Sequence, residues 1–295
     1  MIKNNNIDMK RLTLKRLFTT AFALLFSVAL FAQENTLLWK ISGNGLTKDS
    51  YLFGTLHMAC AEDFKMEDKV KEVAQKAEAI AFEIDMANPE NMTKVQEFMK
   101  PNLEFFKDFD PAKKKVIDSI MTSYQIPPAI FDQVAPAAVI SILSMRSFAC
   151  SDFKTVKMME NEIRNLPAVN GKPIAELETV EFQFNLLNNL FSPEDFYNYL
   201  TIEGGLEAST KKLVQAYFSE NLKEIENLTL KSGYLSEEEQ AKFLDERNHT
   251  WMEKMPNMMK EKAYLFAVGA GHLVGKNGMI ELLKKQGYKL TPILD

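Results

Sequence analysis

The chain has 295 residues with 35 Lys and Arg against 40 Asp and Glu, which gives a formal net charge of −5. This acidic balance argues against nucleic acid and anionic membrane surfaces as partners. The length fits one large domain, or one core with a helical insertion. After residue 32, no stretch of the sequence is long and apolar enough to span a bilayer.

Residues 1–32 have the layout of a secretory signal peptide. A basic stretch precedes the mostly apolar run Ala21–Phe31, and cleavage is expected after Ala32. An uncleaved anchor is the alternative. Cleavage would leave a single domain over residues 33–295 and would make the chain more acidic. We therefore expect a periplasmic or secreted protein.

The chain begins its folded part with two predicted strands, Thr36–Ile41 and Tyr51–Leu56, around a turn rich in Gly, Asn and Asp. This pattern is typical of a hairpin. Gly54 inside the second strand indicates a bulge or the close approach of another group. Apolar residues at helical spacing predict a helix over residues 66–77.

The next strand is predicted to run into two carboxylates, because residues 79–85 read Ala-Ile-Ala-Phe-Glu-Ile-Asp. Glu83 lies between Phe82 and Ile84, and a buried carboxylate needs a partner or a metal. We predict a role for Glu83 in a functional site. Asp85 is expected to be a solvated residue at the strand end.

Residues 90–230 are predicted to be mostly helical, with abundant Met and Phe as core packing and prolines at the helix boundaries. A short strand is expected within residues 171–179, where it carries Glu176 and Glu178. The expected helices are Met92–Met99, Pro111–Tyr124, Val134–Phe148, Phe153–Asn165, Val180–Leu190, Pro193–Glu203 and Leu206–Phe218.

A later helix is predicted to begin at the capping box that starts with Ser236 and to end at Pro256. Arg247 falls on its apolar face beside Trp251. An arginine on a packed face is costly unless it meets an anion; a snorkelling side chain at the edge of the face is the alternative.

Two residues follow Arg247 directly. Asn248 is a candidate to face the substrate or to support the site, and His249 lies off the apolar face and is expected at the surface.

The end of the chain is predicted to contribute a core strand over residues 262–268, a Gly-rich turn, a helix and a last strand over residues 289–294. That order is typical of an α/β layer. The predicted fold class is therefore α/β (α+β), with a central mixed β-sheet built from both ends of the chain. A large helical insertion is expected at about residues 90–255.

Two stretches near the chain's two ends share one pattern. Tyr51–His57 and Tyr264–His272 each begin Tyr-Leu-Phe and end Gly-x-x-His, and they contain two of only three histidines. Histidine titrates near neutrality and is the commonest metal ligand. We predict that both ends of the fold assemble one site.

The candidate catalytic set is His57, Glu83, Arg247 and His272. Two imidazoles and one carboxylate are sufficient for a divalent metal with open positions, and without a thiolate the ion would be manganese, cobalt or zinc. Metal-bound water is a nucleophile near neutral pH, and Arg247 would hold a substrate carboxylate or stabilise an oxyanion. Without metal, the same groups can perform general acid/base hydrolysis.

The two cysteines, Cys60 and Cys150, permit one disulfide in an exported chain. Such a bridge would pin the loop beside His57, because Cys60 lies three residues after it. Two buried free thiols are the alternative.

The chain as a whole resembles the TraB/GumN/PrgY family, which includes the animal TIKI proteins and is similar to the erythromycin-esterase and ChaN-like group. The resemblance covers residues 36–295. The matching pieces are Leu38–Gly43, Tyr51–Met58, Phe82-Glu83, Glu176–Thr179, Glu246–Asn248 and Val268–Gly275.

The resemblance implies a mixed sheet with helical additions. Its TIKI members are regarded as metal-dependent proteases that use two Gly-x-x-His histidines and a glutamate. Carried over, His57, Glu83 and His272 would be metal ligands or acid/base residues. Arg247 matches the family's Arg-Asn element, and Glu178 matches a Glu-Thr element expected to support the ligands or face the substrate.

The predicted function is an exported metal-dependent hydrolase, a peptidase, acting on a peptide or small-molecule substrate. One alternative is metal-free hydrolysis of an ester or amide. Another is a non-catalytic periplasmic protein that binds a peptide or a tetrapyrrole.

Overall fold

The computed structural model describes residues 35–294 except 102–104, 106, 108 and 232–234. The predicted leader, residues 1–32, lies outside the described residues. The described residues from Thr36 onward form one compact unit. Among them, no helix is both long and apolar enough to cross a membrane.

A six-stranded sheet in the order β6-β4-β7-β2-β1-β8 forms the centre of this unit. Its strands come from both ends of the chain, with the helical region between them, so the predicted α/β class with a mixed sheet is confirmed. The strands are β1 (Leu38–Ser42), β2 (Ser50–Thr55), β4 (Ala79–Phe82), β6 (Ile174–Glu176), β7 (Tyr264–Gly269) and β8 (Lys289–Pro292).

Four neighbouring strands of the sheet, β6, β4, β7 and β2, are parallel, whereas β1 is antiparallel to β2 and β8. The register places Thr55 opposite Gly269, and Phe82 opposite both Ala267 and Glu176. The carboxyl ends of the four parallel strands therefore meet at one edge of the sheet, where ligands commonly bind in α/β proteins.

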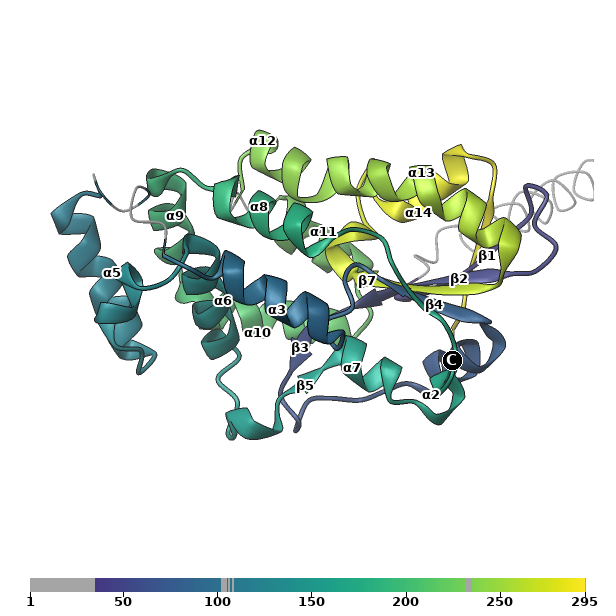
Figure 1. Cartoon of the computed structure of the whole chain (residues 1–295), viewed down its shortest axis with the longest axis horizontal. Coiled ribbons are helices and arrows are strands. Elements are labelled where there is room, and N and C mark those ends of the chain that lie inside the picture. The colour runs from purple at the N-terminus through teal and green to yellow at the C-terminus, as the bar shows by residue number, and fades with distance from the viewer. Residues whose placement is uncertain (1–34, 102–104, 106, 108, 232–234, 295) are drawn as a thin grey trace, which may run out of the picture. The chain divides into compact units, whose positions relative to one another are not determined.

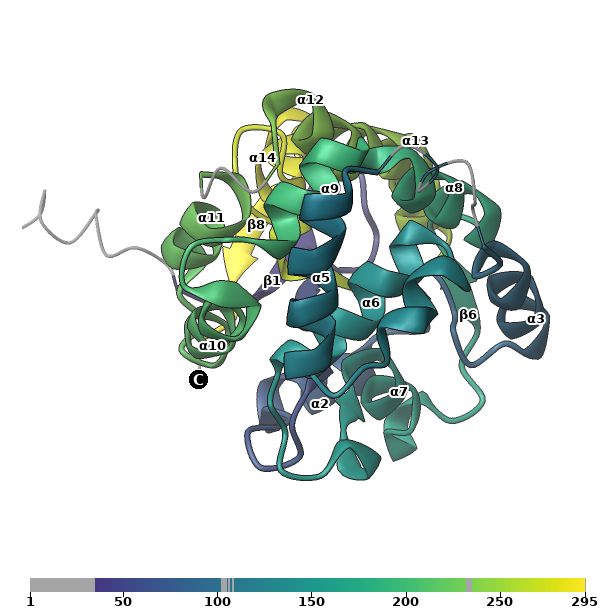
Figure 2. The same cartoon turned by 90° about the vertical axis from the view of Figure 1, so that its left-hand side faces the viewer.

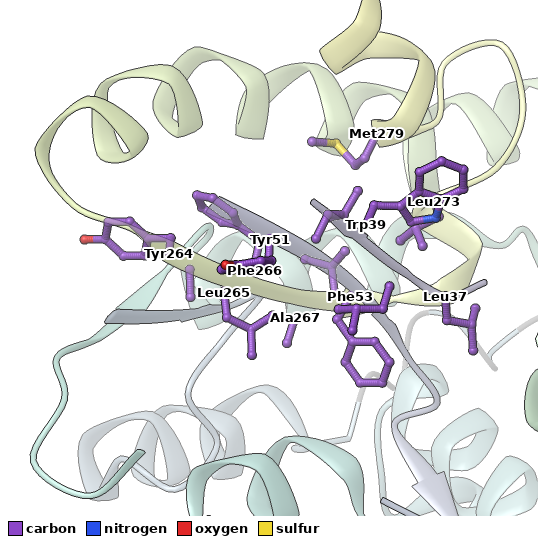
Figure 3. Packing of buried hydrophobic residues seen from close by; sticks show 14 of the residues in the cluster. Leu37, Trp39, Tyr51, Phe53, Tyr264, Leu265, Phe266, Ala267, Leu273 and Met279 are labelled. Atoms are coloured by element: carbon purple, nitrogen blue, oxygen red, sulfur yellow. The ribbon is translucent and has the colours of Figure 1, made fainter. Parts of the chain in front are cut away.

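The strands β2 and β7 are buried along their whole length, as expected for central parallel strands covered on both faces. Figure 3 shows their side chains packed together with Trp39, Leu273 and Met279. A Cβ added at Gly54 would lie 2.9 Å from Leu273 Cδ2 and 3.2 Å from Ala270 Cα. The predicted close approach at this glycine is confirmed.

Helices cover both faces of the sheet (Figures 1 and 2). The helices α13 (Glu246–Glu261) and α14 (Met279–Lys285) lie over one face, and α2 (Asp68–Lys76) and α7 (Met159–Arg164) lie over the other.

The helical region between β4 and β7 has a second buried cluster, which includes Ile117, Leu143 and Phe196. Prolines and capping side chains begin several of its helices, as at Asn88 and Asp110. Its helices are α3 (Pro89–Phe98), α5 (Pro111–Ser123), α6 (Pro136–Ser147), α8 (Val180–Leu190), α9 (Pro193–Leu200), α10 (Gly205–Phe218), α11 (Leu222–Leu230) and α12 (Glu237–Gln240).

The prediction of one helix over Phe153–Asn165 is wrong in its first half. A 3₁₀ turn is followed by β5 (Lys157–Met158), which pairs with β3 (Met58–Ala59), and only then does α7 begin. Pairing with a segment about 100 residues earlier overrides the local helical pattern, which carries no sign of that partner.

The prediction that Pro256 ends its helix is also wrong, because α13 continues to Glu261. Proline removes one hydrogen bond inside a helix. The methionines on either side of it, Met255 and Met259, are fully or almost fully buried, and this burial offsets the lost bond.

Candidate functional site

The candidate residues lie just beyond the carboxyl ends of the four parallel strands. Glu83 directly follows β4, and His57 and Glu178 each lie two residues beyond β2 and β6. His272 lies three residues beyond β7, at the end of a 3₁₀ turn. The parallel register therefore brings together side chains that are up to 215 positions apart in the sequence.

The carboxylate of Glu83 is buried at the centre of this cluster. Its Oε1 accepts a hydrogen bond from the Gly269 N–H at 2.7 Å and lies 4.0 Å from His57 Nε2 and 3.8 Å from His272 Nε2. Its Oε2 accepts from Arg247 Nη2 at 2.6 Å. One carboxylate oxygen thus faces both imidazoles while the other is paired.

Arg247 comes from the first turn of α13, directly after a π-helical turn over Ala241–Asp245. Besides Glu83, it binds Glu178 through Nε at 3.0 Å and donates from Nη1 to the Phe243 carbonyl at 3.1 Å. Its side chain is only 3% exposed. The anions that Arg247 meets are therefore two carboxylates of the protein itself, so the structure gives no support to a substrate contact.

Two further side chains complete the bonding of the buried carboxylates. Gln183 Nε2 donates to Glu83 Oε2 at 3.2 Å and to Glu178 Oε1 at 2.9 Å, and Trp251 Nε1 donates to Glu178 Oε2 at 3.3 Å. No separate sequence pattern predicts a role for Gln183, which lies in the first turns of the helix that Thr179 caps.

His272 is buried, and Asn248 fixes its tautomer. The Asn248 amide donates to the carbonyls of His272 and Asn277 at 3.3 and 2.8 Å, which leaves its Oδ1 facing His272 Nδ1 at 2.7 Å. An amide oxygen only accepts, so Nδ1 carries the proton and Nε2 presents a lone pair. The Trp251 ring packs against the imidazole, with the two ring centroids 4.4 Å apart.

His57 occupies the open side of the cluster, with 60% of its side chain exposed. Its Nδ1 lies 2.8 Å from Glu160 Oε1, and Thr55 Oγ1 donates to the same oxygen at 2.8 Å. Glu160 was not predicted from the sequence, because it lies 103 residues from His57 in a segment without a motif.

The segment after His57 is tied to the segment that carries Glu160. The His57 carbonyl accepts from the Met159 N–H at 3.2 Å, next to the β3–β5 pairing. A disulfide joins Cys60 and Cys150, and no cysteine is free in the part of the chain that the structure describes.

The two histidines have opposite protonation behaviour. The protein atoms around the His57 ring disfavour its charged form, but the nearby carboxylates of Glu160 and Glu83 outweigh this and raise the pKa of His57 to about 9. Burial and Arg247 lower the pKa of His272 to about 3. Burial would raise the pKa of Glu83, yet Arg247 and the histidines hold it well below its usual range. At neutral pH His57 is therefore cationic, His272 neutral and Glu83 ionised.

Asp85 differs from its prediction, since it is buried rather than solvated. Its carboxylate pairs with Arg164, and its N–H donates to Glu176 Oε1 at 2.7 Å. Its own partners, rather than solvent, satisfy this side chain. His249 is exposed, as predicted.

The nitrogens of His57 and His272 lie further from the Glu83 carboxylate than the ligands of a bound divalent metal lie from one another. Two ligands of a tetrahedral zinc at about 2.0–2.1 Å stand roughly 3.4 Å apart, whereas the nitrogens of His57 and His272 lie 4.0 and 3.8 Å from Glu83 Oε1. Accordingly, no group of three or more His, Cys, Asp or Glu among the described residues is arranged to hold a metal ion.

The space in front of Gly269 allows these donors to move closer together. A Cβ at this residue would lie 3.3 Å from both Glu83 Oε1 and His57 Nε2, so the glycine keeps the centre of the cluster open. Two imidazoles and one carboxylate are donor types that a divalent ion accepts. Their spacing around Glu83 Oε1 is wider than that of ligands on a bound ion.

The mixed sheet, with two histidines around a buried carboxylate at its carboxyl edge, defines an α/β protein with a candidate hydrolytic or metal centre. The model of the TraB/PrgY/gumN family matches residues 37–292, and the chain belongs to this family. The predicted family membership is thereby confirmed.

A relative with a named activity is the Danio rerio protein called Metalloprotease TIKI1. It is 23% identical over 316 residues, which cover 87% of this chain and 63% of the relative. The chain thus spans less than two thirds of that protein's length. A comparison with solved structures found no match.

Proposed function

We propose that this protein is an exported metal-dependent hydrolase that cleaves peptides, with His57, Glu83 and His272 as the residues that would hold the ion. The observation that carries the proposal is that Nε2 of both His57 and His272 lies within 4.0 Å of Glu83 Oε1, beside Gly269. The name of the TIKI relative, a metalloprotease, agrees with this proposal.

A divalent ion bound there would polarise a substrate carbonyl and lower the pKa of water. The protein's own residues prepare the site for it. Asn248 holds the His272 ring with Nε2 unprotonated, and Arg247 keeps Glu83 ionised by pairing with its far oxygen. Glu178 offsets the charge of Arg247 and fixes its guanidinium plane.

Export is supported by two features of the chain. Residues 1–32 have the pattern of a cleavable leader. The Cys60–Cys150 disulfide belongs to an oxidising compartment such as the periplasm or the extracellular space.

The test is cleavage of a peptide mixture by the purified protein, with and without chelator, followed by return of manganese, cobalt or zinc. We expect chelator to abolish cleavage and one ion to restore it. His57→Ala and His272→Ala should each reduce the rate by at least about a hundredfold. His249→Ala, which removes the exposed third histidine, is the matched control and should behave as wild type.

A second candidate, metal-free ester or amide hydrolysis, is favoured by the protonation states of the two histidines. A cationic His57 and a neutral His272 would supply an acid and a base without any ion. Equal rates with and without chelator would support this candidate against the first. Saturable peptide or tetrapyrrole binding without any product would support a binding protein instead.

A further inference from the structure

We propose that Glu160 is the positioning residue of His57, holding the exposed imidazole so that Nε2 faces Glu83. This inference rests on the proposed function, because it assigns Glu160 to the open half of the candidate metal site. No sequence motif points to Glu160.

Side-chain hydrogen bonds connect the strand β2, the carboxylate of Glu160 and the ring of His57. Glu160 Oε1 accepts from Thr55 Oγ1 at 2.8 Å, and Thr55 is the last residue of the buried strand β2. The same oxygen lies 2.8 Å from His57 Nδ1. The exposed His57 ring is thereby connected to the sheet through the carboxylate of Glu160. The Glu160 side chain itself is only 19% exposed.

The main chain ties the two residues together independently of these bonds. The residue next to Glu160, Met159, donates its N–H to the His57 carbonyl at 3.2 Å. The β3–β5 pairing continues from this bond, and the Cys60–Cys150 disulfide closes the far end of the two segments. Glu160 and His57 are thus held in place relative to each other by main-chain pairing and a disulfide as well as by their side-chain bonds.

The buried half of the cluster shows the same arrangement with a different partner. Asn248 Oδ1 accepts from His272 Nδ1 and directs Nε2 toward Glu83. In both halves an oxygen accepts a hydrogen bond from the Nδ1–H group, so Nε2 is the nitrogen that faces the site. Partners of this kind set the orientation of ligating histidines, and their loss typically reduces metal affinity about 10–100-fold.

The experiment compares wild type with Glu160→Leu, Glu160→Gln and Glu162→Leu. Leucine removes the acceptor, and glutamine keeps an acceptor oxygen without the charge. Glu162→Leu is the matched control, because it removes a carboxylate from the same helix that pairs with Lys157. Glu160→Ala, which adds no bulk, is the second variant should Glu160→Leu fail to fold.

Two quantities are measured on the full protein. The first is the order of each of the three histidine rings in the metal-free protein, from NMR relaxation of the ring carbons. The second is the dissociation constant for Co²⁺ or Zn²⁺, from competition with a chelator. Ring order reports positioning without any metal, so it also decides the proposal for a protein that binds none.

We expect the His57 ring in wild type to be nearly as ordered as that of His272, and in Glu160→Leu to be as mobile as that of exposed His249. Metal affinity should fall about 10–100-fold in Glu160→Leu, fall less in Glu160→Gln, and stay unchanged in Glu162→Leu.

An equally ordered His57 ring in wild type and Glu160→Leu would overturn the proposal, whatever the metal affinity. A mobile ring with unchanged metal affinity would support the positioning of His57 by Glu160 and contradict the proposed role of His57 as a metal ligand. Wild-type protein that binds no metal would refute the proposed function, while the loss of ring order in Glu160→Leu would still support the positioning of His57.

Discussion

The two Gly-x-x-His ends of the chain are alike in sequence and different in surroundings. His272 is buried against Trp251, bonded to a neutral amide, and uncharged near neutral pH. His57 is 60% exposed, bonded to the carboxylate of Glu160, and protonated near neutral pH. One motif therefore supplies a rigid half and an open half of the same cluster.

The two halves are stabilised by different kinds of interaction. The buried half depends on a network of paired charges and hydrogen bonds between the sheet and α13, with Arg247 at its centre. The open half depends on tertiary connections, namely the β3–β5 pairing and the Cys60–Cys150 disulfide. Each half should accordingly respond to its own kind of perturbation.

The largest effect on stability is expected in the buried half. Arg247→Met would leave Glu83 and Glu178 buried without their shared cation, and we expect it to lower the free energy of unfolding by about 3–5 kcal/mol. Chemical denaturation of the metal-free protein measures this.

The control is Lys94→Met, which breaks the exposed pair with Glu181 and should cost about 1 kcal/mol or less. Equal effects of the two substitutions would show that the buried network is not the main support of this half.

Removal of the disulfide is the next largest change and acts on the open half. Cys60→Ala/Cys150→Ala opens a covalent loop with a sequence separation of 90, and the expected cost is about 2–5 kcal/mol. Hydrogen exchange should show faster opening at Met58 and Met159 while the amides of β7 keep their relative protection. Equal loosening of both segments would contradict the division into two halves.

Gly269→Ala tests the space that the two halves share. The added Cβ would lie 3.3 Å from Glu83 Oε1 and His57 Nε2, so we expect a stability cost of about 1–3 kcal/mol and a marked loss of metal affinity. Gly271→Ala, in the same turn, would place its Cβ at an ordinary 3.4 Å from Thr229 and is the control. Metal titration of both variants makes the comparison, and unchanged affinity in Gly269→Ala would place the ion elsewhere.

The two halves are also expected to have opposite pH dependences of stability. The pKa of His57 rises from 6.5 to about 9 on folding, so the folded state holds the extra proton, and this stabilisation is lost as pH rises from 6.5 through 9. The pKa of His272 falls from 6.5 to about 3, so its contribution is lost as pH falls from 6.5 toward 3.

Stability measured against pH should therefore lose part of its alkaline slope in His57→Asn and part of its acid slope in His272→Asn. Both measurements use metal-free protein. The same slope change in both variants would mean that the two histidines have equivalent environments.

Much of the fold was predictable because its signals are local. Apolar runs and the Gly/Asn turn identified the strands β1, β2, β4 and β7, and proline and capping residues identified most helices. The exposed status of His249 and the packed-face position of Arg247 followed from helical spacing alone.

The remaining features depend on contacts that no local pattern records. Glu160 meets His57 only because a two-residue strand pairs across the fold, and Gln183 meets Glu83 only because α8 follows the neighbouring strand β6. Asp85 was expected in solvent, since its partner Arg164 lies 79 residues away. Glu178, Arg247 and Asn248 were named from the sequence, whereas Glu160 and Gln183 were not.

The most direct test of the central claim, that both histidines and Glu83 hold one divalent ion, is a calorimetric metal titration at pH 6 in buffers of different ionisation enthalpy. We predict one ion per chain with the release of about one proton, because His57 is protonated there while His272 and Glu83 are already deprotonated. His57→Ala should abolish the proton release together with most of the affinity. Folded wild-type protein that takes up no ion, or that binds one equally well without His57, would contradict the account.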